Sequence, residues 1–531
     1  MKRFLSIILV IMLIFSTVGC SSQNNSGEDS TTSIEPSQTE EIQNTKENEG
    51  LNEISRELDC DIVVIGGGGS GLSAAASAAR DGADVILLEK LFYLGGSLMG
   101  SEGIFAVESP LQKERGITYT TDKGYHELLN YHHYNNNARV VRAFVEASGP
   151  TIEWLMEIGA EFSDVALSQG VPDTYYWHIY KNGGQDFAKT IENAAVDAGV
   201  EILTETSGKS LIMDNGKVAG VMAEDKDGNK IKINSKAAII CTGGFGSNAE
   251  MLKKYVGIDA SEYSMYGSSG HDGDGINMAF EVGAAEYGIE FIQSGAGMVK
   301  GEPFGSPLVD VCKQPYLWIN SVGIRFISET SSAVPQLGGN AMRQQPGSFF
   351  YNVFDADTLK QIMETGYLQG RVMYPHSKDP EPKMLEILTE AATNGSGNVF
   401  IGETVEDLAD KLGIESAALQ ATFDEYNELC EKGEDTWFAK DPNYLIPVKT
   451  GPFYAVKVGA EMLGTIGGIK INENAEVISI EEKVIPGLYA AGCDAGGLHG
   501  ADYDFSMSGV TSGWAVVSGR IAAQNAVKYV K

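Results

Sequence analysis

The sequence has 531 residues, of which 43% are hydrophobic and 21% are charged, a balance typical of globular proteins. This length indicates two or three domains with ample material for a hydrophobic core. Lys and Arg number 39 against 72 Asp and Glu, and the net charge of −33 disfavours a nucleic-acid partner because it repels phosphate backbones.

The N-terminus has the pattern of an export signal. A basic pair, Lys2-Arg3, precedes an apolar run from Phe4 to Phe15 and then a stretch of small residues. The run is shorter than the roughly 20 residues that span a bilayer as a helix. Cys20, directly after a small residue, resembles the lipobox cysteine of bacterial lipoproteins, although Thr17 stands where that family usually has Leu. The resemblance implies a signal peptide over residues 1–20, lipid attachment at Cys20 and a lipid anchor on the extracytoplasmic face of the cell membrane. Ordinary secretion is the alternative.

Residues 21–56 predict a flexible tether. The segment is rich in Ser, Asn, Thr and Glu and has few apolar side chains. It therefore cannot bury enough surface to offset the entropy lost on ordering. No later apolar run is long enough for a transmembrane helix, so the anchor would be the lipid alone.

The first folded segment has the pattern of a dinucleotide site. "IVVI" at residues 62–65 predicts a buried strand, and "LSAAASAA" at residues 72–79 predicts a helix of small residues. The glycines between them suit a tight turn, close approach to a pyrophosphate and close helix packing. A second strand ends in Glu89, close to the spacing of about 20 residues at which an acid binds ribose hydroxyls. Because this carboxylate disfavours a 2′-phosphate, NADP is disfavoured and NAD and FAD remain open.

A second glycine-rich loop and four later motifs favour FAD. The loop lies within "EKLFYLGGSLMGSEGIF", directly after the second strand. The later motifs are "AAIICTGGFGSN", "SSGHDGDGINMAFEVGA", "SVGIRFISE" and "GLYAAGCDAGGLHGAD". Together they resemble, in the same order, the fumarate reductase and succinate dehydrogenase flavoproteins of the FAD-dependent oxidoreductase 2 family. The resemblance implies an α/β fold, with a Rossmann-like FAD-binding domain and an inserted α+β capping domain, and FAD as the cofactor.

The motifs also predict domain limits and cofactor contacts. The first and last motifs belong to one domain, so we expect the FAD-binding domain at residues 57–285 and 451–531 and the capping domain at 286–450. The predicted cofactor-binding residues are Gly66, Gly68, Ser70, Gly71, Glu89, Lys90, Gly95, Gly96, Ser97, Gly103, Asp274, Gly492, Ser508 and Gly509.

Two helical segments are predicted from spacing and breakers. In the capping domain, apolar residues at helical spacing predict an amphipathic helix within residues 414–433 whose stripe packs in a core. Residues 137–162 predict a pair of helices interrupted at Gly149-Pro150.

The substrate-binding pattern of the family is absent. In this family the flavin N5 donates a hydride to one alkene carbon, an arginine protonates the other, and further Arg and His side chains clamp the substrate carboxylates. Here "TSSAV" at residues 330–334 has no arginine, and Ser294 lies near the position of a family histidine. Leu463-Gly464 replaces a pair of histidines, and Tyr503 replaces the clamping arginine. Fumarate and succinate are therefore disfavoured as substrates.

These differences favour reduction of an activated C=C bond in a neutral or aromatic small molecule. Tyr503 is the predicted proton donor or substrate anchor, and His499 and Arg325 are further catalytic candidates. A separate membrane electron carrier is expected, because the chain has no haem motif or second flavin domain. One alternative is an FAD-dependent ketosteroid-type dehydrogenase. Another is a non-catalytic lipoprotein that carries electrons on its flavin.

Cysteine and histidine spacing predicts neither a disulfide framework nor a metal site. The six cysteines include no C-x-x-C pair, and an odd number remains once Cys20 carries lipid. The adjacent histidines of "YHHY" at residues 131–134 lack nearby Cys or acidic partners.

Overall fold

A computed structural model describes most of the chain after the predicted tether. The described residues are 54–168, 173–265, 269–303, 305–371, 377–501, 503 and 506–531. The predicted signal peptide, Cys20 and residues 21–53 of the predicted tether lie outside them. Residues 54–56, which we expected in the tether, instead begin strand β1 (Ile54–Asp59). No helix in the described ranges has both the length and the hydropathy needed to cross a membrane.

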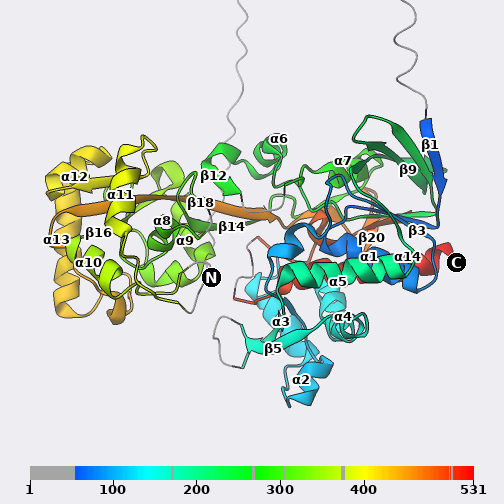
Figure 1. The fold of residues 1–531 in the computed structure, drawn as a ribbon, viewed down its shortest axis with the longest axis horizontal. Helices are drawn as coiled ribbons and strands as arrows, with labels where there is room; N and C mark the ends of the chain where they lie inside the picture. Colours follow the sequence, from blue (N-terminus) through cyan, green and yellow to red (C-terminus); the bar gives the residue numbers. More distant parts are fainter. Residues whose placement is uncertain are drawn as a thin grey trace, which may run out of the picture. The chain divides into compact units, whose positions relative to one another are not determined.

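A six-stranded sheet forms the centre of the FAD-binding domain (Figure 1). Its strands, in spatial order, are β20 (Glu476–Ile478), β21 (Val484–Ala490), β11 (Ala237–Ile240), β2 (Ile62–Ile65), β3 (Val85–Leu88) and β7 (Glu201–Leu203). All neighbours are parallel except β20, which is antiparallel to β21. The strands β2, β3 and β11 are continuous apolar runs because both faces of a central parallel sheet are buried.

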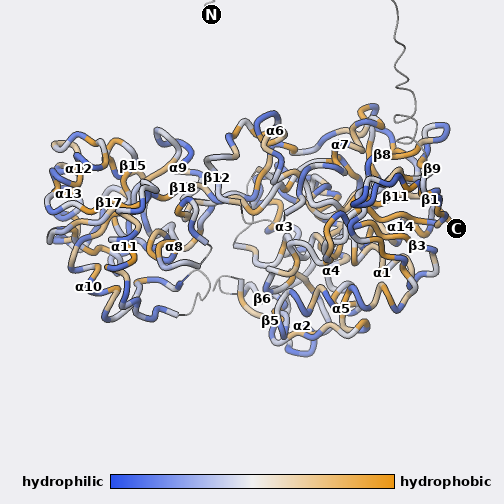
Figure 2. The backbone as a smooth tube through the Cα atoms, turned by 45° about the horizontal axis from the view of Figure 1, so that its top comes forward, coloured by the Kyte–Doolittle hydropathy of each residue, from blue (hydrophilic) through white to orange (hydrophobic). Residues whose placement is uncertain are grey.

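The sheet lies between a layer of helices and a second sheet. The helices are α1 (Gly69–Arg80), α5 (Gly184–Asp197) and α14 (Val510–Val530), and Figure 1 shows them side by side. The second sheet has the order β1, β10 (Lys230–Asn234), β9 (Lys217–Asp225), β8 (Thr206–Asp214) and packs on the central sheet through β9. Hydrophobic and hydrophilic residues follow each other in turn along α5 (Figure 2), because one face of this helix is buried and the other is exposed.

Helix α4 (Ala138–Glu157) is continuous, so the predicted interruption at Gly149-Pro150 is wrong. Gly149 is required for packing: a Cβ there would lie 2.4 Å from the carbonyl oxygen of Val107. Pro150 removes only one backbone donor, and the buried apolar face around Phe144 and Ile152 holds the helix together across it. The neighbouring helices are α2 (Pro110–Glu114) and α3 (Thr121–Tyr131).

Two small sheets complete this domain. One consists of β4 (Gly103–Phe105), β6 (Tyr175–Tyr180) and β5 (Phe162–Leu167). The other consists of β13 (Glu286–Tyr287), β19 (Gly468–Lys470) and β22 (Ala495–Gly496). The short helices α6 (Ala249–Met251) and α7 (Asp274–Glu281) follow β11 in the chain.

The capping domain is built around the long strand β18 (Phe453–Thr465) (Figure 1). The strands that belong to this sheet are β12 (Tyr263–Met265), β14 (Ile292–Met298), β15 (Leu317–Asn320), β16 (Phe350–Phe354) and β17 (Val399–Gly402). The helices around it are α8 (Pro307–Cys312), α9 (Pro335–Arg343), α10 (Ala356–Glu364), α11 (Met384–Thr393), α12 (Val405–Leu412) and α13 (Ser416–Lys432). The predicted amphipathic helix is confirmed as α13, whose buried residues include Leu419, Phe423, Tyr426 and Leu429.

The apolar cores divide the chain slightly later than the motifs predict. One core contains buried residues up to Ile292 and again from Met462, whereas the two cores of the capping domain lie between Ala296 and Ala460. Most of β18 therefore belongs to the capping sheet, although we expected residues from 451 onward in the FAD-binding domain. In the sequence, the loop before β18 resembles a domain boundary. The pairing of β18 with β16 and β17 instead assigns this strand to the capping domain.

Candidate active site

A cavity of about 640 Å³ lies beyond the carboxyl ends of β2, β3 and β11, where ligands bind in open α/β sheets. Its lining comes from the first motifs, the middle motifs and the C-terminal segment of the chain. Every predicted cofactor-binding residue lines it except Gly71 and Gly95. Gly95 instead donates its backbone N–H to the carbonyl oxygen of Gly67 at 2.9 Å.

The turn between β2 and α1 shows why glycine occurs where it does. At Gly71 a Cβ would lie 1.7 Å from the carbonyl oxygen of Gly66, and at Gly66 it would lie 2.2 Å from that of Cys241. At Gly68 a Cβ would meet nothing within 4 Å, so that side of the turn is open. Gly68 also provides no side chain to cap α1. The first backbone N–H groups of the helix are therefore left to bind a phosphate.

Glu89 has a fixed orientation at the end of β3. Its two carboxylate oxygens accept hydrogen bonds from the backbone N–H groups of Gly67 and Leu91, each at 2.7 Å. Each oxygen keeps a second lone pair, which suits a ribose hydroxyl. The glycine turn, the uncapped helix and this carboxylate fit the adenosine and pyrophosphate groups of FAD.

Lys90 and Asp274 contact each other. The Lys90 Nζ lies 2.7 Å from Asp272 Oδ2 and 2.9 Å from Asp274 Oδ2. Burial opposes the charge of Lys90, but the hydrogen bonds to the two carboxylates outweigh it and raise the pKa of this lysine. The positive charge of Lys90 is thus already compensated within the protein.

Asp494 holds the turn that follows β11, and sequence reasoning missed it. Its fully buried carboxylate accepts hydrogen bonds from the Thr242 hydroxyl at 3.0 Å and from the backbone N–H groups of Thr242, Gly243 and Gly244. Burial raises the pKa of Asp494, although these donors oppose the shift. The hydroxyl of Thr465 accepts from the Phe245 N–H and holds the turn from a second side. No local pattern in the sequence marks Asp494 for this role.

Tyr503 lines the cavity, as expected for a proton donor or substrate anchor. Its backbone carbonyl accepts a hydrogen bond from the Tyr131 hydroxyl at 2.9 Å, which connects this segment to α3. His499 is buried and is not part of the cavity lining. Its ring lies 6.5 Å from the ring of Tyr503 and 6.0 Å from that of His132, measured between ring centroids. His499 therefore packs near Tyr503 but does not line the cavity.

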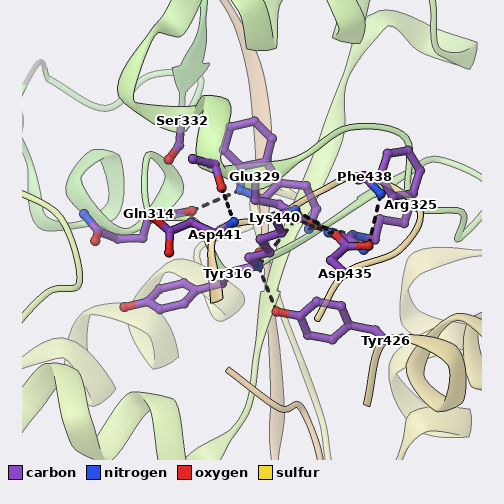
Figure 3. A network of polar contacts seen from close by, with 12 residues as sticks. Gln314, Tyr316, Arg325, Glu329, Ser332, Tyr426, Asp435, Phe438, Lys440 and Asp441 are labelled. Carbon is purple, nitrogen blue, oxygen red and sulfur yellow. Dashed lines mark hydrogen bonds and ion pairs between the residues drawn. The ribbon is translucent and has the colours of Figure 1, made fainter. Parts of the chain in front are cut away.

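The structure contradicts a catalytic role for Arg325. This residue lies in the capping domain, within the buried network of Figure 3, and does not line the cavity. Its guanidinium binds both carboxylate oxygens of Glu329, at 2.8 and 2.7 Å, and Asp435 Oδ2 at 2.6 Å. Lys440 completes the network through Glu329 at 3.4 Å. Two cations and two carboxylates thus balance each other in a site without access to substrate.

Two further side chains that line the cavity were not predicted from the sequence. Trp177, on β6, lies against Gly103, where a Cβ would be 2.6 Å from the indole Nε1. Gln293, on β14, is a long polar side chain in a strand made otherwise of apolar and small residues. That contrast was a usable signal, but the strand pairing was needed to show which way the side chain faces.

The comparison with protein families decides the identity of this fold. The family described as "FAD binding domain" matches residues 61–504. The chain belongs to the FAD-dependent oxidoreductase 2 family. A vinyl phenol reductase of Lactiplantibacillus plantarum is 33% identical over 88% of this chain and 96% of its own length. A urocanate reductase of Eggerthella lenta is 28% identical over 88% of this chain and 74% of its own.

Solved structures of this family have the same fold. The open conformation of a flavocytochrome c3 fumarate reductase is 27% identical and superposes with a TM-score of 0.69, covering 90% of this chain and 79% of that one. The FAD-dependent oxidoreductase 2 assignment and the site geometry agree on the cofactor. The protein is an FAD-dependent oxidoreductase that acts on CH–CH groups.

Proposed function

We propose that this oxidoreductase reduces the activated C=C bond of a neutral aromatic small molecule. The observation that carries the proposal is the charge of the cavity wall. The described residues of the lining include no arginine, and their lysine, Lys90, is held by Asp272 and Asp274. Burial lowers the pKa of His271, which therefore adds no positive charge near neutral pH. A dicarboxylate would find no free cation here, and transferring its charges from water would cost free energy without compensation.

The wall also offers apolar surface. Leu463 lines the cavity and is 41% exposed, which suits contact with an aromatic ring. Leu463 and Gly464 stand where fumarate reductases have their paired histidines. The similarity to a vinyl phenol reductase supports a substrate of the hydroxystyrene type.

The residues of the chain have distinct roles in this reaction. FAD, when bound in its reduced form, supplies the hydride that adds to one carbon of the alkene. Tyr503 holds a proton at its hydroxyl oxygen and donates it to the other carbon. Tyr131 positions Tyr503 through the hydrogen bond to its carbonyl.

Replacing Tyr503 by phenylalanine should lower kcat by about 100-fold or more, because general acid catalysis contributes on that order. Stopped-flow reoxidation of the reduced holoenzyme by 4-vinylphenol measures this change. Tyr134→Phe is the matched control, because Tyr134 is exposed and does not line the cavity. An unchanged kcat in the Tyr503→Phe variant would show that another group protonates the substrate.

The reaction class is tested by mixing the reduced holoenzyme anaerobically with 4-vinylphenol, urocanate, fumarate and an enone steroid. Rapid reoxidation by 4-vinylphenol and none by fumarate is the expected result. Reoxidation by fumarate alone would contradict the argument from the charge of the wall. Turnover of a saturated ketosteroid with an artificial acceptor would instead establish a dehydrogenase, and no turnover in either assay would favour an electron carrier.

We further propose that the enzyme is lipid-anchored through Cys20 on the extracytoplasmic face and receives electrons from a separate membrane carrier. The basic, apolar and small-residue order of residues 1–20 supports this location. In cells, Cys20→Ser should move the protein from the membrane to the soluble fraction. Retention of the variant in the membrane would refute the lipid anchor.

A further inference from the structure

An amide side chain in the cavity wall has no hydrogen-bond partner among the residues that the structure describes. Gln293, on β14, is 9% exposed and lines the cavity. Its side chain makes no hydrogen bond to any group in the described part of the chain. Its amide has two N–H donors and an accepting oxygen. The amide atoms remain accessible from the cavity, so they can exchange hydrogen bonds with a complementary group of a bound ligand.

The surroundings of this amide indicate an uncharged ligand group. In the pairing of β14 with β18, Gln293 lies opposite Gly464. A Cβ on Gly464 would meet no heavy atom within 4 Å, so the space beside the amide is open. Leu463 adds apolar surface, and Glu461 is neutralised by Lys313 at 3.1 Å. A charged group would find no counter-charge here, whereas a hydroxyl or carbonyl would be matched by the amide.

We propose that Gln293 and the open space at Gly464 form a subsite for the hydroxyl or carbonyl group of the substrate. For a hydroxystyrene, this group is the phenolic hydroxyl, which donates to or accepts from the amide. The inference rests on the proposed function and adds which part of the substrate is recognised. It predicts that the enzyme discriminates against substrates that have the same ring but lack the polar group.

The test measures binding to the oxidised holoenzyme and needs no turnover. The flavin absorbance is titrated with 4-ethylphenol and with ethylbenzene, which differ only in the hydroxyl group. The wild-type enzyme should bind 4-ethylphenol about 10-fold more tightly, as expected for one neutral hydrogen bond. Gln293→Met keeps the length of the side chain and removes its polar atoms. This variant should lose the preference through weaker binding of 4-ethylphenol, while its affinity for ethylbenzene is unchanged.

Gly464→Ala provides a second, steric test. The added methyl group would have no heavy atom of the described residues within 4 Å and would occupy the space beside Gln293. The variant should fold and retain FAD, and its affinity for 4-ethylphenol should fall. Thermal unfolding and the FAD-to-protein ratio should match the wild type in both variants, because neither substitution removes a contact within the protein.

Three results would overturn the subsite: no preference for 4-ethylphenol in the wild type, a preference that survives in Gln293→Met, or loss of FAD from that variant. The last result would assign the amide to the cofactor. Failure of the proposed function is distinct, because it appears as the absence of reoxidation by alkenes. A preference that depends on Gln293 in an enzyme that reduces no alkene would sustain the subsite and refute the reductase.

Discussion

Replacing Gly71 by alanine should abolish FAD binding. A Cβ at this position would lie 1.7 Å from the carbonyl oxygen of Gly66 and 2.9 Å from its carbonyl carbon. Both atoms belong to the backbone of the β2–α1 turn, so neither can move without breaking the turn. Helix α1 packs closely against α14, since a Cβ on Gly519 would lie 2.2 Å from the carbonyl oxygen of Ser70. Helix α1 therefore cannot shift to make room for the added methyl group. The ratio of flavin to protein absorbance after purification and the thermal unfolding midpoint measure the effect.

Gly68→Ala is the matched control for this prediction. Gly68 has an extended conformation that alanine adopts readily, and its Cβ would meet no atom of the protein. The variant should therefore fold normally, whereas its affinity for FAD should fall because the methyl group enters the cavity. A Gly71→Ala protein with wild-type FAD content would contradict this description of the turn.

The second large effect is expected at Arg325. Replacing it by methionine should lower the free energy of unfolding by about 3–5 kcal/mol, because Glu329 and Asp435 would stay buried without their cationic partner. Since Arg325 does not line the cavity, kcat per bound FAD should remain near the wild-type value. Chemical denaturation and steady-state kinetics on the same preparation separate the two effects.

Arg56→Met is the control for Arg325. Arg56 pairs with Glu201 at 2.9 Å, but the two side chains are 49% and 45% exposed, so the expected loss is about 0–1 kcal/mol. Lost kcat with unchanged stability in the Arg325→Met variant would restore the catalytic role that the sequence suggested.

The stretch around Arg325 shows how far a motif can mislead. "SVGIRFISE" is a family signature, and an arginine within it is a reasonable catalytic candidate. The partner that completes its buried network, Asp435, lies 110 residues further along the chain. A motif identifies the residue types at given positions. The role of a side chain within it depends on the residues that the fold places beside that side chain.

Local physics determined much of this protein from sequence alone. A buried strand, a glycine turn and a helix of small residues form a dinucleotide-binding turn through steric contacts between residues close in sequence. The acid at the end of the next strand is recognised by its spacing from these glycines. The apolar spacing of α13 likewise needs only helical periodicity. Tertiary structure alone decided that α4 continues through Pro150, that β18 belongs to the capping sheet, that Asp494 holds the turn after β11 and that Gln293 faces the cavity. These four features depend on burial and on contacts between segments far apart in sequence, which local composition and spacing do not encode.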